Sequence, residues 1–201
     1  MSAQVVFADA NVLYSRTTRD WLFLLRRASA GGMFTVITSE DVIAETTYHV
    51  RKKFPLADGD MIATLYDQIS NSCDDIVRKF PGGKKSPSAD IHDSHVHAAA
   101  THAKADYLLT SDSGFTGLSD EVRDLLSYEV YTPDELFCLI ADSAPQVVRN
   151  VVVEQMAYWA SKSKPDGRQR SIVERLEAAG CRQFAVYVQT QIKQLAGIPA
   201  S

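Results

Sequence analysis

Short apolar runs alternate with segments in which apolar residues recur every three or four positions along the first 142 residues. Such runs are typical of buried parallel strands, and the periodic segments are typical of helices packed on a sheet. The predicted strands are residues 5–8, 34–37, 107–110 and 128–131. The predicted helices are residues 17–30, 39–54, 60–80 and 91–104, and one that begins at residue 132. This alternation predicts an α/β fold with a parallel sheet covered by helices on both faces.

Helix-capping residues, glycines and prolines support these element boundaries. Thr17 followed by Asp20 has the spacing of a capping box, and Gly31 supplies the stop of the same helix. Thr132 before a proline, with glutamate three positions later, predicts another helix start. The stretch 81–88, which holds two prolines and two glycines, predicts a loop.

The pattern changes after about residue 142. Residues 146–161, 169–179 and 183–195 read as three helices without a strand between them. We therefore divide the chain into a head, residues 1–142, and an all-helical C-terminal extension, residues 143–201. The apolar stripe of the extension leaves three interpretations open, because packing on the head, a homodimer interface and a docking surface for another protein all need one.

Two aspartates follow predicted strands. Asp9 closes the first strand, and Asp112 comes shortly after the strand at 107–110. In an open parallel sheet, ligands bind beyond the carboxyl ends of the strands. Glu45 lies at the flank of the buried stripe of its helix, where a carboxylate can lean over that edge. Asp93 lies in the first turn of its helix, and Asp90 is placed to cap that turn.

Carboxylates gathered in one place cannot all stay ionised unless a cation lies among them. A set of oxygen ligands suits Mg²⁺ or Mn²⁺. Such ions activate water and offset the charge that develops on a phosphate oxygen. The acids therefore predict metal-dependent phosphodiester hydrolysis, in which no side chain acts as the nucleophile.

The distribution of charge along the chain bears on whether it can bind nucleic acid. The chain has 201 residues and a net charge of −4, so bulk charge does not mark it as a nucleic-acid binder. The head carries −8 and the extension +4. Three basic clusters could contact an RNA backbone: residues 51–53, residues 84–85 and the basic side chains between 162 and 170.

We place the protein in the cytoplasm. Its three cysteines are far apart and read as reduced thiols. The N-terminal residues do not have the pattern of a leader sequence, and the longest apolar clusters are too short to span a bilayer.

Four histidines crowd one predicted helix, but no cysteine lies nearby and no HExxH motif is present, so packing or solvated roles are favoured over zinc binding. These histidines are His92, His95, His97 and His102.

Four segments together resemble the acidic motifs of PIN-domain nucleases, in order, spacing and context: residues 9–13, 42–45, 93–100 and 110–112. The resemblance covers roughly residues 4–140 and is closest to VapC-type toxin ribonucleases of type II toxin–antitoxin pairs. It implies a PIN-like (Rossmann-like) fold and a metal-dependent endoribonuclease that a cognate antitoxin holds inactive. Its matched metal-binding acids are Asp9, Glu45, Asp93 and Asp112, with Asn11, Thr110 and Asp90 as secondary polar candidates. The compact toxins of this type lack the helical extension.

Three other functions share parts of this pattern. A PIN nuclease of RNA processing that is not a toxin would carry the same acids. A non-catalytic PIN-like module that binds RNA or protein would not need all four of them. A phosphotransferase of the haloacid-dehalogenase kind would need a second aspartate two positions after Asp9, where this chain has Asn11.

Overall fold

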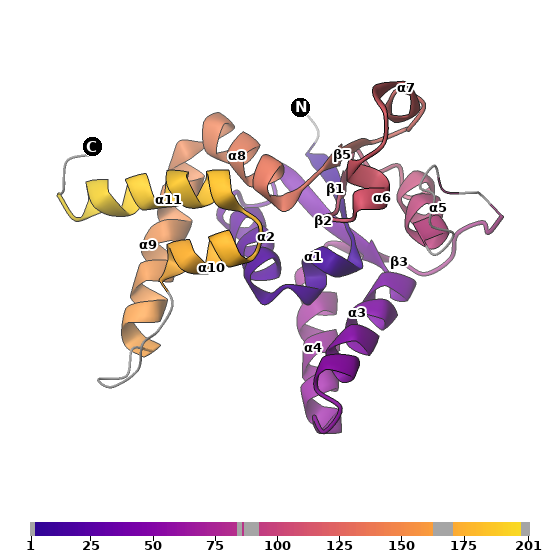
Figure 1. Cartoon of the computed structure of the whole chain (residues 1–201), viewed down its shortest axis with the longest axis horizontal. Coiled ribbons are helices and arrows are strands. Elements are labelled where there is room, and N and C mark those ends of the chain that lie inside the picture. The colour runs from indigo at the N-terminus through magenta and orange to yellow at the C-terminus, as the bar shows by residue number, and fades with distance from the viewer. Residues whose placement is uncertain (1–2, 84–85, 87–92, 163–170, 198–201) are drawn as a thin grey trace.

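In the computed structural model, which describes residues 3–83, 86, 93–162 and 171–197, five strands form one parallel sheet. Its order is β3-β2-β1-β4-β5, and every neighbouring pair is parallel. The strands are β1 (Gln4–Ala8), β2 (Phe34–Ser39), β3 (Asp75–Val77), β4 (Tyr107–Leu109) and β5 (Glu129–Tyr131). Helices flank this sheet (Figure 1), so the predicted α/β architecture is confirmed.

The strand order places a topological switch point at one edge of the sheet. From β1 the chain moves outward through β2 to β3, and it then returns to the other side of β1 to form β4 and β5. The carboxyl ends of β1 and β4 therefore flank the point where the direction of winding reverses. In open α/β sheets, this is where ligands bind. Asp9 follows β1 directly, and Thr110 follows β4.

Eight helices are described in the head. Five of them are α1 (Ala10–Tyr14), α2 (Arg16–Ala28), α3 (Glu40–Lys53), α4 (Gly59–Ser72) and α5 (Ser94–His102). The others are α6 (Ser113–Thr116), α7 (Asp120–Arg123) and α8 (Pro133–Ser143). The capping box predicted at Thr132 and Glu135 is confirmed, and both of its hydrogen bonds are present.

The start of α2 differs from the prediction. Ser15 is its N-cap and accepts a hydrogen bond from the amide of Thr18, whereas Thr17 lies inside the first turn. The predicted capping box of Thr17 and Asp20 is wrong. The short helix α1, which the sequence pattern does not reveal, ends at Tyr14, and Ser15 then serves both as its C-cap and as the N-cap of α2. Asp20 pairs with Arg16 instead, at 3.4 Å.

The helix predicted over residues 60–80 is also wrong in its second half. α4 ends at Ser72, and the chain turns at Cys73 into the edge strand β3. The turn is fixed by Asp74, whose amide donates to the carbonyl of Val36 while its carboxylate accepts from the amide of Val36. The helix predicted over residues 91–104 is observed as α5, and its first residues lie outside those described.

The C-terminal extension folds into α9 (Pro145–Lys162), α10 (Ile172–Ala178) and α11 (Arg182–Leu195), in agreement with the three predicted helices. Their buried residues belong to the same hydrophobic cluster as the core of the head. The ring of Phe184 lies 5.0 Å from that of Trp21 and 5.3 Å from that of Phe137. The division at residue 142 stays a prediction.

No single helix among the described residues is long and apolar enough to cross a membrane; α8 and α9 pass that test only together, with a bend of 115° between them.

Candidate metal-dependent nuclease site

Asp9 is the centre of the site. It caps α1, and its Oδ1 accepts a hydrogen bond of 2.6 Å from the amide of Ala10. Its Oδ2 accepts from Asn11 Nδ2 and from Thr110 Oγ1, both at 2.7 Å. Only 6% of Asp9 is exposed. The carboxylate is therefore held in one orientation by groups that follow β1 and β4 in the chain.

Asn11 and Thr110 tie the two strand ends together. Asn11 Nδ2 also donates to Thr110 Oγ1, at 2.9 Å, and Asn11 Oδ1 accepts from the amide of Ser111. Both residues were predicted as polar neighbours of the acids, and the structure places both of them on Asp9. They add hydrogen bonds to the site without adding negative charge.

Glu45 and Asp93 approach the same centre from two helices. Glu45 lies in α3, at the flank of the buried stripe as predicted, and Asp93 is the N-cap of α5. Both carboxylates act on Asp9 through their charge, and each raises the pKa of its carboxyl group. Burial is the larger cause, and together with these charges it outweighs the hydrogen bonds from Thr110 and Ala10 and raises the pKa of Asp9 to about 6.

Two histidines flank Glu45. His95 Nε2 lies 3.4 Å from Glu45 Oε2, and His49 Nε2 lies 3.4 Å from Glu45 Oε1. The hydrogen bond from His95 is the main cause of a lowered pKa of Glu45, and His49 adds to it. His49 was not among the predicted site residues. Its position four residues after Glu45, on the same face of a helix, is the sequence signal that could have found it.

Asp112 is less directly engaged. Its amide donates to Thr110 Oγ1, the same hydroxyl that contacts Asp9. Its carboxylate caps α6 by accepting from the amide of Gly114 at 2.6 Å. Asp112 therefore lies at the predicted edge of the sheet, with one oxygen already used for local structure. Asp90 and His92 lie outside the described residues.

The donor set fits a hard divalent cation in its chemistry, since Asp9, Glu45, Asp93 and Asp112 offer only oxygen ligands. Repulsion between the first three carboxylates, visible in the raised pKa of Asp9, is what a cation at this position would relieve. Within the part of the chain that is described, however, no three carboxylate, imidazole or thiol groups lie close enough together to coordinate one ion. Side-chain rotation would therefore be needed for three of these acids to share one ion, whereas Mg²⁺ can also bind through one or two carboxylates and complete its shell with water.

Comparison of the sequence with models of known protein families identifies its family. The family model of the PIN domain matches residues 5–114, just over half of the chain. The chain belongs to the PIN-domain family. PIN domains are typically nucleases and usually use divalent metal ions. The matched segment ends just after Asp112, so it contains Asp9, Glu45, Asp93 and Asp112, whereas the C-terminal helices lie outside it. No curated protein and no solved structure matches the chain significantly.

Proposed function

We propose that this PIN domain is a metal-dependent endoribonuclease that hydrolyses RNA phosphodiester bonds. The observation that supports it best is the position of Asp9, a buried carboxylate at the switch point of the sheet on which the charges of Glu45 and Asp93 act. A buried group with a strongly shifted pKa, set at the switch point where α/β sheets bind ligands, is typical of a functional site.

Each residue of the site would have a distinct role in this reaction. Asp9, Glu45, Asp93 and Asp112 would hold Mg²⁺ or Mn²⁺, which when bound activates water and offsets negative charge on the phosphate. Asn11 and Thr110 fix the orientation of the Asp9 carboxylate by donating to its Oδ2. His95 and His49 restrain Glu45 from opposite oxygens. Because Asn11 and Thr110 are neutral, they do not add to the repulsion that a phosphate meets here.

The first test measures cleavage. Purified protein is incubated with total tRNA and ribosomal RNA in Mg²⁺ or Mn²⁺, with EDTA as the control. We expect Asp9→Asn to lose more than about 100-fold in rate, since even the outer partners of metal ligands are worth 10–100-fold. Asp67→Asn, an exposed acid on α4, is the matched control and should retain activity. Cleavage in EDTA, or full activity of Asp9→Asn, would contradict the proposal.

A second readout does not depend on cleavage. A metal ion that binds only the folded protein raises its melting temperature. Mn²⁺ should therefore raise the melting temperature of the wild type and of Asp67→Asn, and should have little effect on Asp9→Asn. An equal shift in all three proteins would place the metal elsewhere.

We propose further that the enzyme acts in the cytoplasm as the toxin of a toxin–antitoxin pair. This proposal is supported by the likeness of its four acidic motifs to those of VapC-type toxins. Expression of the wild type should then arrest growth, and expression of Asp9→Asn should not. Co-expression of a small neighbouring reading frame that encodes the antitoxin should restore growth, and growth unaffected by the wild type would count against a toxin.

A further inference from the structure

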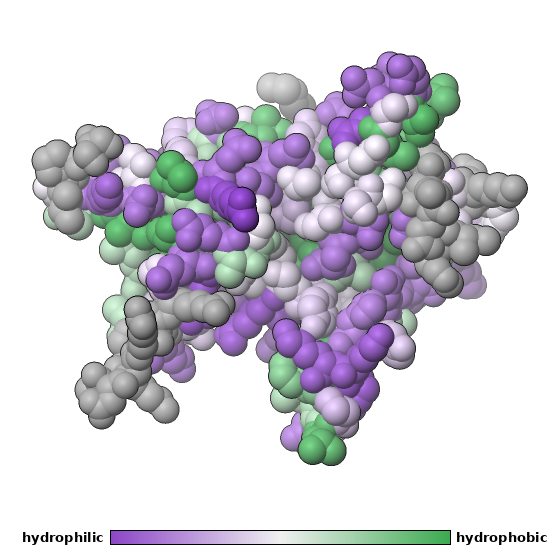
Figure 2. Space-filling view, viewed as in Figure 1, coloured by the Kyte–Doolittle hydropathy of each residue, from purple (hydrophilic) through white to green (hydrophobic). Residues whose placement is uncertain are grey.

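A concavity lies outside the acidic site, which consists of Asp9, Glu45, Asp93, Asp112 and their surroundings. It is a groove of about 1390 Å³ between α2, the α3–α4 pair and the helices α9 and α10. Figure 1 shows α3–α4 and α9 projecting in the same direction on either side of α2, and Figure 2 shows mostly hydrophilic surface where the face between them is hollowed. The groove is larger than the 300–1,000 Å³ that is usual for a small-molecule pocket. Its size and openness therefore suit a polymer.

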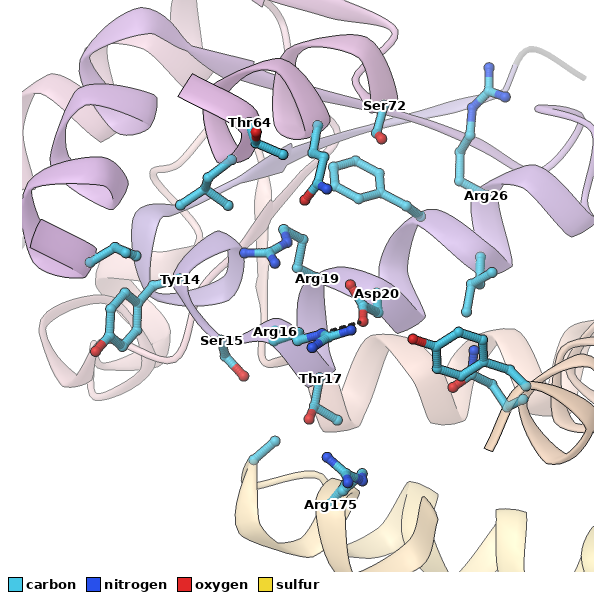
Figure 3. Close-up of a pocket in the computed structure, with 18 of the residues that line it drawn as sticks. Tyr14, Ser15, Arg16, Thr17, Arg19, Asp20, Arg26, Thr64, Ser72 and Arg175 are labelled. Atoms are coloured by element: carbon cyan, nitrogen blue, oxygen red, sulfur yellow. Dashed lines mark hydrogen bonds and ion pairs between the residues drawn. The ribbon is translucent and has the colours of Figure 1, made fainter. Parts of the chain in front are cut away.

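The charge of this groove is opposite to that of the acidic site. Two acidic residues line it, Asp20 and Glu154. Six basic residues line it: Arg16, Arg19, Arg26, Arg27, Lys53 and Arg175. All four arginines of α2 are among them, and Figure 3 shows three of these together with Arg175 around the cavity.

Ion pairs remove part of this excess. Arg16 pairs with Asp20 at 3.4 Å, and Arg27 contacts both oxygens of Glu154. Arg26 pairs with Asp74, which does not line the groove. The side chains of Arg16 and Arg27 are nevertheless 68% and 62% exposed, and exposed pairs of this kind stabilise a protein little. Both arginines can therefore exchange a carboxylate for a phosphate at small cost.

One face of α3 connects the acidic site to the groove. Glu45, His49 and Lys53 follow one another at intervals of four residues, so they lie on the same face over about 12 Å. Tyr14 joins this row, since its ring lies 6.1 Å from that of His49 and 5.6 Å from Lys53 Nζ. The ammonium group of Lys53 thus lies in the wall of the groove that α3 contributes, on the same helix face as Glu45.

The opposite wall comes from the C-terminal extension. The Arg175 guanidinium lies 3.9 Å from the centroid of the Trp159 ring. Trp159 is itself held by a hydrogen bond from its Nε1 to Gln155 Oε1. Arg175 is therefore presented in a fixed position in the groove, so less side-chain freedom is lost when it binds an anion.

We propose that this groove binds the phosphate backbone of the RNA substrate on one side of the scissile phosphate, with the C-terminal helices as its outer wall. The proposal rests on the proposed nuclease function and adds a substrate path to it. Lys53 and Arg175 would contact phosphates from the two walls of the groove. Arginine interleaved with tyrosine and tryptophan is typical of sites for single-stranded nucleic acid, which favours RNA over an acidic polypeptide.

The test compares two double variants of equal charge. Lys53→Gln with Arg175→Gln removes a cation from each wall of the groove. Lys52→Gln with Arg182→Gln removes an exposed cation beside Lys53 and one from α11, both outside the groove. Binding of a fluorescent single-stranded RNA is measured in EDTA at several salt concentrations, so cleavage plays no part.

The groove variant should bind RNA about tenfold more weakly at low salt, because each neutralised phosphate releases counterions. The slope of log K against log salt should fall by about 1.4, at about 0.7 for each phosphate of a single strand that is no longer neutralised. The control variant should bind like the wild type. The single variant Lys53→Gln, at a solvent-exposed helix end, keeps Arg175 on the Trp159 ring and so guards against misfolding. It should show about half of that change in slope.

Equal RNA binding by the groove variant and the control would overturn the proposal. So would a groove variant that binds RNA normally but loses affinity for an acidic peptide such as poly-glutamate, since the groove would then serve a protein partner. Failure of the nuclease proposal is a separate result, seen as equal cleavage by the wild type and Asp9→Asn. If the wild type cleaves RNA and the groove variant keeps its KM, only the groove proposal fails.

Discussion

The Asp9 carboxyl group is held in a position that is unfavourable for its own charge. It is buried, and Glu45 and Asp93 add their negative charges to the cost of burial, so its pKa is raised to about 6. The hydrogen bonds from Ala10 and Thr110 lower the pKa but do not cancel the burial. At neutral pH without metal, the folded protein therefore carries an electrostatically destabilised carboxylate at this position, and a nearby divalent cation would relieve that cost.

This strain predicts how stability depends on pH. The folded pKa of about 6 lies above the ordinary value of 3.8, so the folded state binds the proton more tightly and stability falls as pH rises from about 4 to about 6. The difference corresponds to about 3 kcal/mol at neutral pH, at 1.36 kcal/mol per unit. Replacing Asp9 by asparagine removes the charge and so avoids that cost, but it also replaces one hydrogen-bond-accepting oxygen, which lowers stability by about 1 kcal/mol.

Asp9→Asn should therefore raise the free energy of unfolding by about 2 kcal/mol at pH 7.5, and this gain should shrink towards zero at pH 4.5. Urea denaturation in EDTA at the two pH values measures both quantities. Asp67→Asn is the control and should change stability by less than about 0.5 kcal/mol. A lower stability of Asp9→Asn at pH 7.5 would show that the carboxylate is not strained.

At the scale of the elements, the edge strand β3 is positioned by the residue before it, Asp74. It has three residues, and it pairs with β2 through Ile37, Thr38 and Ser39. Asp74 precedes it, accepting from the amide of Val36 at 2.8 Å and from Arg26 Nε at 3.0 Å. A strand this short has little apolar surface of its own, so Asp74 fixes where α4 ends and β3 begins.

Asp74→Ala should lower the free energy of unfolding by about 2 kcal/mol, because it leaves the Val36 amide without its acceptor and removes a charged hydrogen bond to a partly exposed arginine. Chemical denaturation measures the loss. Asp75→Ala removes the neighbouring exposed carboxylate and should cost less than about 0.5 kcal/mol. Equal losses in the two variants would mean that the turn does not depend on Asp74.

At the scale of the whole molecule, Phe184 joins the extension to the head. It is fully buried, and its ring lies edge-on to that of Trp21 in α2. The amides at the start of α11 are also tied to the head, since those of Gln183 and Phe184 donate to the carboxylate of Asp134 in α8. These contacts favour a head and an extension that unfold together.

Phe184→Ala should lower the free energy of unfolding of the whole chain by about 3–5 kcal/mol, the usual cost of emptying a buried phenylalanine site. Tryptophan fluorescence and circular dichroism should report the same single transition in the wild type and in the variant. Val186→Ala, at a position 62% exposed on the same helix, is the control. Two separate transitions would support independent folding of residues 1–142 and 143–201.

Local patterns were enough to predict much of this molecule. Alternating apolar runs and helical periodicities depend on neighbours a few residues away, so four of the five strands and most of the long helices could be read from them. Strand ends are also local features, which is why Asp9 and Asp112 were expected at one edge of the sheet. Helices α1, α6 and α7 were missed because four or five residues make little more than one helical turn and carry no readable period. Strand β3 was missed because its two apolar residues, Ile76 and Val77, lie between charged residues and do not form an apolar run.

The sequence by itself determined the α/β class, the PIN-like motifs and the four acids, because each rests on residue type and short-range spacing. Only the tertiary structure decided the contacts of those acids. Glu45 lies between two histidines, Asp112 caps α6, and Asp9 is buried and accepts a hydrogen bond from the Thr110 hydroxyl, which also contacts the amide of Asp112. It also decided that cations from α2, α3 and α10 line one groove. Burial and charge at such sites come from segments far apart in the chain, and no local pattern records them.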